Sequence, residues 1–283
     1  MILFFENGRI GNQLFQYSGL TKFFPKDKLV FFGCEDLDRY FDSVDAQFIS
    51  KSLLPGLIRF GTLRRIAFFL AKARILGLIT EGLHSDDFIL NVRSGLLWNI
   101  YVGHNLFFQH PDVFNQIQIT PRLKPYLTDA AHSWLRRKQP NIRSNSLVFV
   151  HIRRGDYLHW PFNEFPAVLD FVWYKCAMEL MRQKIENPIF IFMSDDLYYL
   201  RDVFTESDTL VISDNSREID LAIMSLCCSG ILSASSFAWW GAFYARSQNK
   251  LGATFLAPKY WGGHRCKSWY PPNFYTDWIT YIE

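Results

Sequence analysis

The sequence lacks a hydrophobic run that could cross a membrane. Its most apolar long stretch, residues 66–79, is interrupted by Lys72 and Arg74 and is shorter than the roughly 20 residues that a spanning helix needs. The first residues, Met1–Phe5, also lack the basic leader and the cleavage site of a secretory signal. We therefore expect a soluble, cytoplasmic protein without a transmembrane segment.

The same stretch leaves one kind of membrane contact open. Arg64 and Arg65 precede Lys72 and Arg74 within a helical pattern. A basic amphipathic helix can rest on a membrane surface as a peripheral contact, while a solvated helix face is the simpler explanation of the same pattern.

Strong charge is also lacking, since the formal net charge is +3 and no run of like charges occurs. This balance argues against nucleic acid as a partner, so any bound anion is expected to be small. The five cysteines form no Cys-x-x-Cys pair, and their odd number fits a reducing compartment. Gly8 and Gly11 lack the third glycine of a dinucleotide fingerprint, so NAD is not expected.

Aromatic side chains are present in excess, with 27 Phe, 13 Tyr and 9 Trp. They suit a phenylalanine-rich core, and they could also offer flat faces on which sugar rings stack. The length of 283 residues exceeds a typical domain of about 100 to 200 residues, so two domains are expected.

The C-terminal half alternates between strands and helices. Continuous apolar runs are typical of parallel strands covered on both faces, and helical spacing at residues 171–185 and 219–226 separates several of them. In such an open α/β sheet, ligands bind at the carboxyl ends of the strands. The expected strands are Leu147–Ile152, Ile189–Met193, Leu210–Ile212, Ile231–Leu232 and Phe255–Ala257.

The N-terminal half begins with an expected strand at Met1–Phe5, a glycine-containing loop at residues 6–11 and then a helical pattern. Between residues 36 and 95 the pattern is mostly helical, and no strand can be assigned. Turn residues cluster near residues 139–145 and predict a linker. The expected domains are residues 1–140 and 145–283.

A pair of arginines follows the strongest predicted strand. Arg153 and Arg154 come directly after Leu147–Ile152, at a strand end where ligands bind. A guanidinium donates two parallel hydrogen bonds to phosphate oxygens, so Arg153 is a candidate for neutralising a leaving diphosphate. Arg154 could bind phosphate too, or it could pair with Asp156 and only stiffen the turn.

The segment His151–Tyr157, with the sequence His-Ile-Arg-Arg-Gly-Asp-Tyr, resembles the first signature of the α-1,2-, α-1,6- and protein O-fucosyltransferases. Two further segments, Gly8–Tyr17 and Ser233–Ala242, match in order the α-1,2-fucosyltransferases of glycosyltransferase family 11, bacterial type. The adjacent Trp239 and Trp240 are distinctive of that family. The resemblance spans the whole chain.

The resemblance implies a GT-B fold, an α/β architecture in which two Rossmann-like lobes face each other across a cleft. Residues 1–140 would form the acceptor-side lobe, with helical insertions, and residues 145–283 would bind GDP-fucose. The implied reaction is inverting transfer of L-fucose from GDP-β-L-fucose to the 2-hydroxyl of a terminal β-galactoside, giving an α-1,2-fucoside. The resemblance implies no metal or other cofactor.

The resemblance also implies roles for single residues. Arg153 would stabilise the leaving diphosphate, and His151 would approach the guanine. Asn12 would hold the donor phosphate or the reacting hydroxyl, Gln13 would orient it, and Gly11 would contact the donor. A helix N-cap is the structural alternative for Asn12.

Ser235, Ser236 and Phe237 follow a short predicted strand at the start of a helix. The N–H groups and the dipole of a helix start favour an anion, so the two hydroxyls suit the pyrophosphate, and Phe237 could face the nucleotide. Both serines could instead only cap the helix. Trp239 and Trp240 cannot share one helix face, so we expect at least one of them in the core.

Asp195 and Asp196 follow the predicted strand Ile189–Met193 and invite a metal-site interpretation. Against it, the two carboxylates are adjacent rather than alternate, the arginines already neutralise phosphate, and the resembled family works without metal. The resemblance assigns an aspartate here to the guanine. Asp196 is chosen because Asp195 suits the N-cap of the next helix, and the reverse assignment stays open.

A general base would assist the acceptor hydroxyl, and no residue identifies itself as that base. Asp156 has the motif position and is the chosen candidate, while Glu6, His159 and Glu164 lie in other candidate loops. A loose transition state would need only weak base help, because the leaving diphosphate can accept the proton late.

Two other functions fit parts of the pattern. A protein O-fucosyltransferase or an α-1,6-fucosyltransferase shares the arginine signature but does not predict the tryptophan pair. A sugar-nucleotide-binding or glycan-binding protein without activity is the non-enzymatic alternative, and the presence of both Arg153 and Asn12 argues against it.

Overall fold

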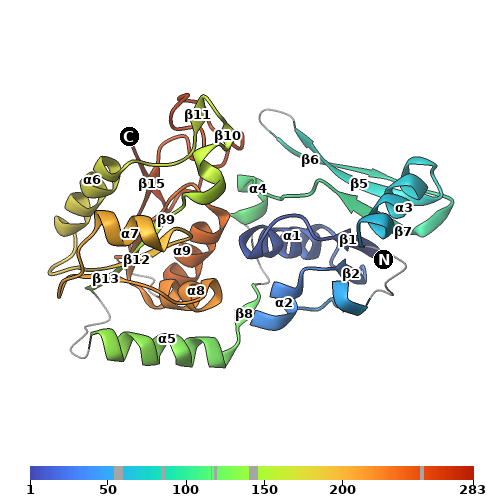
Figure 1. Ribbon diagram of the computed structural model, residues 1–283. Coiled ribbons are helices and arrows are strands. Elements are labelled where there is room, and N and C mark those ends of the chain that lie inside the picture. Colours follow the sequence, from blue (N-terminus) through green and yellow to red (C-terminus); the bar gives the residue numbers. More distant parts are fainter. Residues whose placement is uncertain (54–59, 84–86, 116, 118–119, 140–145, 249–251) are drawn as a thin grey trace. The chain divides into compact units, whose positions relative to one another are not determined.

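The computed structural model describes residues 1–53, 60–83, 87–115, 117, 120–139, 146–248 and 252–283. The chain divides into two compact α/β units, Met1–Arg122 and Leu123–Glu283 (Figure 1). The predicted linker falls largely on residues 140–145, outside the described residues, and the domain boundary placed there stays a prediction.

The first unit is built on a sheet with the strand order β4-β2-β1-β7-β5-β6. All its paired strands are parallel except β6, which runs antiparallel to β5 at the edge. The elements up to the unit boundary are β1 (Ile2–Phe5), α1 (Ile10–Phe23), β2 (Leu29–Phe32), α2 (Glu35–Tyr40), β3 (Phe41–Asp42), β4 (Gln47–Ile49), η1 (Lys51–Leu53), α3 (Phe60–Lys72), β5 (Leu76–Leu83), β6 (Phe88–Arg93), β7 (Leu97–His104), α4 (Pro111–Phe114) and β8 (Arg122–Leu123).

Helix α3 covers one face of this sheet and contacts β5 and β7. Its small residues Ala67 and Ala71 are buried against Phe5, Leu76 and Val102, so the helix lies close to the strands. Because β1, β2 and β7 are parallel, their carboxyl ends lie side by side, and the loops that follow these strands lie together there. We call this the carboxyl edge of the first sheet.

The second unit is built on a fully parallel sheet with the strand order β13-β12-β9-β14-β15-β16. Strand β9 is buried at every position, which explains its continuous apolar sequence. The elements are α5 (Pro125–Lys138), β9 (Leu147–Ile152), η3 (Gly155–Leu158), β10 (Pro161–Phe162), β11 (Phe165–Pro166), α6 (Phe171–Arg182), β12 (Ile189–Ser194), α7 (Leu197–Val203), β13 (Leu210–Ile212), α8 (Arg217–Leu226), β14 (Ser229–Ile231), α9 (Ser236–Gln248), β15 (Phe255–Pro258) and β16 (Thr280–Ile282).

The strand order of the second unit places a topological switch between β9 and β14. From β9 the chain moves outward to β12 and β13, and it then crosses back to β14 on the other side of β9. Right-handed crossovers therefore put α6 and α7 on one face and α8 and α9 on the other, where α5 and α9 also pack against α8. In open α/β sheets, ligands bind at the carboxyl ends of the strands beside such a switch.

The strands predicted for the C-terminal half are confirmed to within a few residues, as is the first strand of the chain. Strand β16 and the strands between residues 36 and 95 were not assigned from the sequence. Within the described ranges, no helix combines the length and the hydropathy that crossing a bilayer requires.

Candidate functional site

The carboxyl ends of β9, β12 and β14 bring most of the predicted donor-site residues together. Arg153 and Arg154 follow β9, Asp195 and Asp196 follow β12, and Ser233 lies just beyond β14. A hydrogen bond of 2.7 Å between Nδ1 of His151 and Oγ of Ser233 joins the two strands at the switch. The candidate site therefore lies where the topology predicts a ligand.

Arg153 is enclosed by two carboxylates. Its Nη1 lies 3.0 Å from Oδ2 of Asp195, and its Nη2 donates a hydrogen bond to Oδ1 of Asp156. Only 15% of the Arg153 side chain is exposed, whereas Asp156 is 60% exposed. Asp195 is the less exposed of the two carboxylates and binds the guanidinium on its buried side, whereas the exposed Asp156 can turn towards solvent.

Arg154 lies between an aromatic ring and another carboxylate. Its guanidinium carbon is 3.7 Å from the centre of the Tyr199 ring, and its Nε donates to Oδ2 of Asp196 at 3.2 Å. The backbone N–H of Arg154 donates to Oδ1 of Asp195 at 2.9 Å. The structure thus pairs Arg154 with Asp196 instead of Asp156.

The capping residue of α7 is Asp196, and the expected cap at Asp195 is wrong. Oδ1 of Asp196 accepts the N–H of Tyr199 at 3.0 Å, because α7 begins at Leu197 and Asp196 immediately precedes it. Asp195 is left to bind Arg153 and the backbone of Arg154. The reason for assigning the guanine to Asp196 rather than Asp195 is therefore removed.

His151 is buried beneath this cluster. Burial, and after it the charge of Arg153, lower the pKa of His151 to about 3, so the ring is neutral at physiological pH. Besides its contact with Ser233, the ring centre lies 5.5 Å from that of Phe237. A neutral imidazole can form hydrogen bonds with a ligand but adds no charge opposite a phosphate.

The start of α9 faces the same switch. Oγ of Ser235 accepts the N–H of Phe237 at 3.3 Å, so this serine caps the helix that begins at Ser236. Trp239 and Trp240 are both completely buried, which makes both of them core residues.

The remaining predicted residues, Gly11, Asn12 and Gln13, lie in α1 of the first unit. The helix begins at Ile10 with Arg9 as its N-cap, so the capping alternative for Asn12 is wrong. Oδ1 of Asn12 accepts a hydrogen bond of 2.9 Å from Nε2 of Gln109.

Gln13 is fully buried beside an ion pair at the carboxyl edge of the first sheet. Its Nε2 donates to Oε1 of Glu6 at 3.1 Å, and Glu6 also pairs with Lys51. Gly8, at φ +92°, allows Asn12 to lie close to the loop, because a Cβ at position 8 would collide with the Asn12 amide. The loop after β1 and the first turn of α1 are thus fixed together.

Sequence reasoning missed three residues of these clusters. Tyr199 supports Arg154, Ser233 binds His151, and Gln109 holds Asn12. The partners are 45, 82 and 97 positions apart in the sequence, and no local pattern connects them. Only the fold brings each pair into contact.

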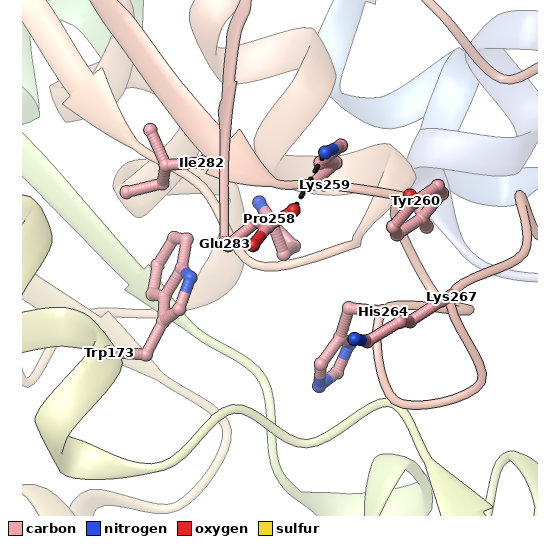
Figure 2. Close-up of a pocket in the computed structure, with 8 residues that line it drawn as sticks. All are labelled: Trp173, Pro258, Lys259, Tyr260, His264, Lys267, Ile282 and Glu283. Carbon is pink, nitrogen blue, oxygen red and sulfur yellow. Dashed lines mark hydrogen bonds and ion pairs between the residues drawn. The ribbon is translucent and has the colours of Figure 1, made fainter.

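A small pocket of about 110 Å³ lies at the ends of β15 and β16, away from the predicted site residues (Figure 2). Trp173 and Ile282 form its apolar wall, and Lys259 pairs with Glu283 across it at 2.7 Å. In the parts of the chain that the structure describes, no three His, Cys, Asp or Glu side chains are grouped as a metal site requires.

Three curated proteins are similar to parts of the chain. The O-antigen biosynthesis glycosyltransferase WbnK of Escherichia coli is 27% identical over 63% of the chain and 59% of its own length. Galactoside α-(1,2)-fucosyltransferase 1 of Mus musculus is 30% identical over 54% of the chain and 42% of its own length. An α-1,2-colitosyltransferase of Escherichia coli is 32% identical over 42% of each chain. The chain thus matches about half the length of these relatives.

The fold resembles that of a solved crystal structure. POFUT1, crystallised in complex with GDP-fucose, superposes with a TM-score of 0.53 over 90% of this chain and 97% of that chain, at 13% sequence identity. The α/β architecture with two largely parallel sheets is therefore a GT-B fold.

The sequence profile of glycosyl transferase family 11 matches residues 92–282. The matched part contains the arginine pair, the two aspartates and the start of α9 that meet at the switch of the second sheet. This chain therefore belongs to glycosyl transferase family 11.

Proposed function

We propose that the protein transfers L-fucose from GDP-β-L-fucose to the 2-hydroxyl of a terminal β-galactoside, with inversion, as a galactoside α-1,2-fucosyltransferase. The observation that carries this proposal is the position of Arg153, which projects from the central strand at the switch point with two carboxylates around it. Family membership and the galactoside α-(1,2)-fucosyltransferase among the relatives support the choice of sugar and linkage.

The diphosphate would bind to Arg153, Arg154 and the start of α9. A bidentate guanidinium neutralises charge as the bond to fucose breaks, and the helix start with Ser235 and Ser236 adds N–H groups and dipole. Because Arg154 stacks on Tyr199, its guanidinium is oriented before the donor arrives. The cluster of two arginines and three aspartates carries one formal net negative charge, so we expect a diphosphate to displace at least one carboxylate.

Asp156 is the carboxylate that we propose to be displaced. It is the most exposed of the three and pairs only with Arg153 among its contacts described above. A diphosphate that takes over this guanidinium would release Asp156, which could then accept the proton of the attacking hydroxyl. Donor binding would thereby free the general base.

The other proposed contacts follow the resemblance to the family. His151 and either Asp195 or Asp196 would bind the guanine, with Phe237 beside it, while Gly11, Asn12 and Gln13 would serve the donor and the reacting hydroxyl from the first unit. The five cysteines are free thiols, which supports a reducing compartment such as the cytoplasm.

A second candidate donor is GDP-colitose, since one relative is named an α-1,2-colitosyltransferase. The two donors differ in the sugar alone, so the diphosphate site described above serves both. Parallel assays with each donor distinguish them, and faster turnover with GDP-colitose would replace fucose in the proposal.

The decisive experiment incubates the full chain with GDP-fucose and lactose, with and without a chelator. We expect GDP release that depends on lactose, an α-1,2-fucosylated product identified by NMR, and no effect of the chelator. GDP release that needs no acceptor would contradict transferase activity, and inhibition by the chelator would contradict the absence of a metal.

A further inference from the structure

The first unit exposes large apolar side chains together on one side of α3. Phe69 is 69% exposed and Ile66 is 48% exposed, three residues apart and hence on the same side of the helix. Their side is opposite to Ala67 and Ala71, which pack on the sheet. Such exposed aromatic and aliphatic residues are not needed by the core of this unit.

The turn between β6 and β7 and the start of β7 add one each. Leu96 is 78% exposed and Trp98 is 71% exposed. The N–H of Leu96 donates to the carbonyl of Arg74 at 2.7 Å, which fixes the turn against the end of α3. Trp98 follows Leu96 by two residues, at the start of β7, where the pairing of β7 with β5 shifts its register. We call Ile66, Phe69, Leu96 and Trp98 the α3 patch.

The two chain segments that carry the α3 patch contain cationic side chains and no carboxylate. Residues 60–80 and 88–106 contain five Lys or Arg and no Asp or Glu. Four of these cations are exposed around the patch, and Arg93 reaches α3, where its Nη2 donates to the carbonyl of Ala71 at 2.6 Å. The exposed cations are Arg65, Lys72, Arg74 and Arg93.

We infer that the α3 patch docks on a membrane surface of anionic phospholipids. Exposed Phe, Leu and Trp side chains insert at the boundary between headgroups and acyl chains, and a ring of cations binds the anionic headgroups. An acidic protein surface would complement the charge but not the protruding apolar side chains, and a second basic copy would repel it. The α3 patch lies at the amino ends of β5 and β7, opposite to the edge that carries Asn12 and Gln13. Docking there leaves that edge uncovered.

The test is co-sedimentation of the full chain with vesicles. One set contains phosphatidylcholine alone, and the other contains roughly one third phosphatidylglycerol. We expect binding only to the anionic vesicles, and a decrease as salt is added. Equal binding to both sets, or binding to neither, would overturn the inference.

Two double variants separate the two contributions. Arg65→Gln with Lys72→Gln should weaken binding about 25-fold, since each cation near an anionic surface contributes roughly fivefold. Phe69→Ser with Trp98→Ser should weaken it at least as much. Val172→Ser on α6, which replaces an apolar residue that is 65% exposed, is the matched control and should bind like the parent.

Thermal unfolding of each variant is the check that the fold is retained, and the exposure of these side chains leads us to expect an unchanged Tm. Unchanged vesicle binding by both double variants would overturn the inference. So would a parent protein that is dimeric in solution and becomes monomeric on Phe69→Ser with Trp98→Ser, because the α3 patch would then bind a second copy.

Discussion

At the scale of single residues, Arg153 is held where a leaving group would need it. Two carboxylates fix its guanidinium at the end of a fully buried strand, so the proposed replacement of one of them by a phosphate would cost little side-chain freedom. Arg154, stacked on Tyr199, is oriented in a different way. The two arginines are therefore not equivalent, although they are adjacent in the sequence.

Arg153→Ala should lower kcat by several orders of magnitude, because transition-state charge on the diphosphate is no longer neutralised. Steady-state kinetics with GDP-fucose and lactose measure this effect. Arg182→Ala is a matched control, since Arg182 pairs with Glu179 within α6 and is 43% exposed, and it should leave kcat unchanged. Near-normal turnover of Arg153→Ala would remove this residue from the mechanism.

Asp156→Asn tests the proposed base separately. Loss of the base should lower kcat by about two orders of magnitude or more, while the affinity for GDP stays the same or improves because one carboxylate no longer competes for Arg153. Calorimetric titration with GDP and a kcat measurement provide both values. An unchanged kcat would show that Asp156 only neutralises Arg153.

At the scale of elements, the turn after β9 brings the backbone of Gly155 close to the carboxylate of Asp195 at the end of β12. A Cβ on Gly155 would collide with Oδ2 of Asp195, the atom that also binds Arg153. The carboxylate is the mobile end of its side chain and can move away, so the collision displaces a contact of the site and leaves the fold intact.

Gly155→Ala should therefore raise the KM for GDP-fucose about tenfold, the cost of losing one charge-assisted hydrogen bond, with little change in Tm. Gly61→Ala provides the control, because a Cβ there meets no atom within 4 Å. A large loss of thermal stability in Gly155→Ala alone would mean that the turn itself, and not Asp195, is disturbed.

The elements also show what sequence patterns can predict. Strands buried on both faces, such as β9, are recognised by their uninterrupted apolar runs. Strand β6 alternates little and is largely exposed, and β16 has only three residues, so neither gives a strong signal. Helix starts were misplaced by one to three residues at Asn12 and Asp195, because several polar residues near each start could serve as the cap.

The residues of the candidate site were nominated from the sequence, but their pairing was not. Which of Asp156, Asp195 and Asp196 binds which arginine depends on how the turn after β9 meets the end of β12. That geometry is set by packing between segments about 40 residues apart. No spacing rule within one segment contains this information.

At the scale of the whole molecule, the buried carboxyl of Asp220 makes the stability depend on pH. Burial raises the pKa of Asp220 to about 7, although Ser213 donates a hydrogen bond of 2.5 Å to it. In the unfolded chain this carboxyl titrates near 3.8. Between pH 3.8 and about 7 the folded protein therefore keeps a proton on Asp220 that the unfolded chain has released. The free energy of unfolding is highest below the lower pKa and decreases as pH rises towards 7.

Asp220→Asn removes this titration while it keeps the shape of the side chain. As pH rises from about 4 to about 8, the Tm of the parent should fall relative to the Tm of the variant, because only the parent loses the stabilisation from protonated Asp220. Above the folded pKa the difference between the two Tm values should stay constant. Thermal unfolding across this range measures the shift. A difference that does not change with pH would show that Asp220 ionises as freely in the folded protein as in the unfolded chain.

The complete burial of β9 affects how readily its backbone opens to solvent. Backbone amides in such a central strand exchange with solvent only when the surrounding unit opens as a whole. Because Arg153 directly follows that strand, its backbone should not loosen by local fraying, in contrast to the turn that carries the exposed Leu96. On heating, the second unit should keep the carboxyl end of β9 ordered until the unit unfolds cooperatively.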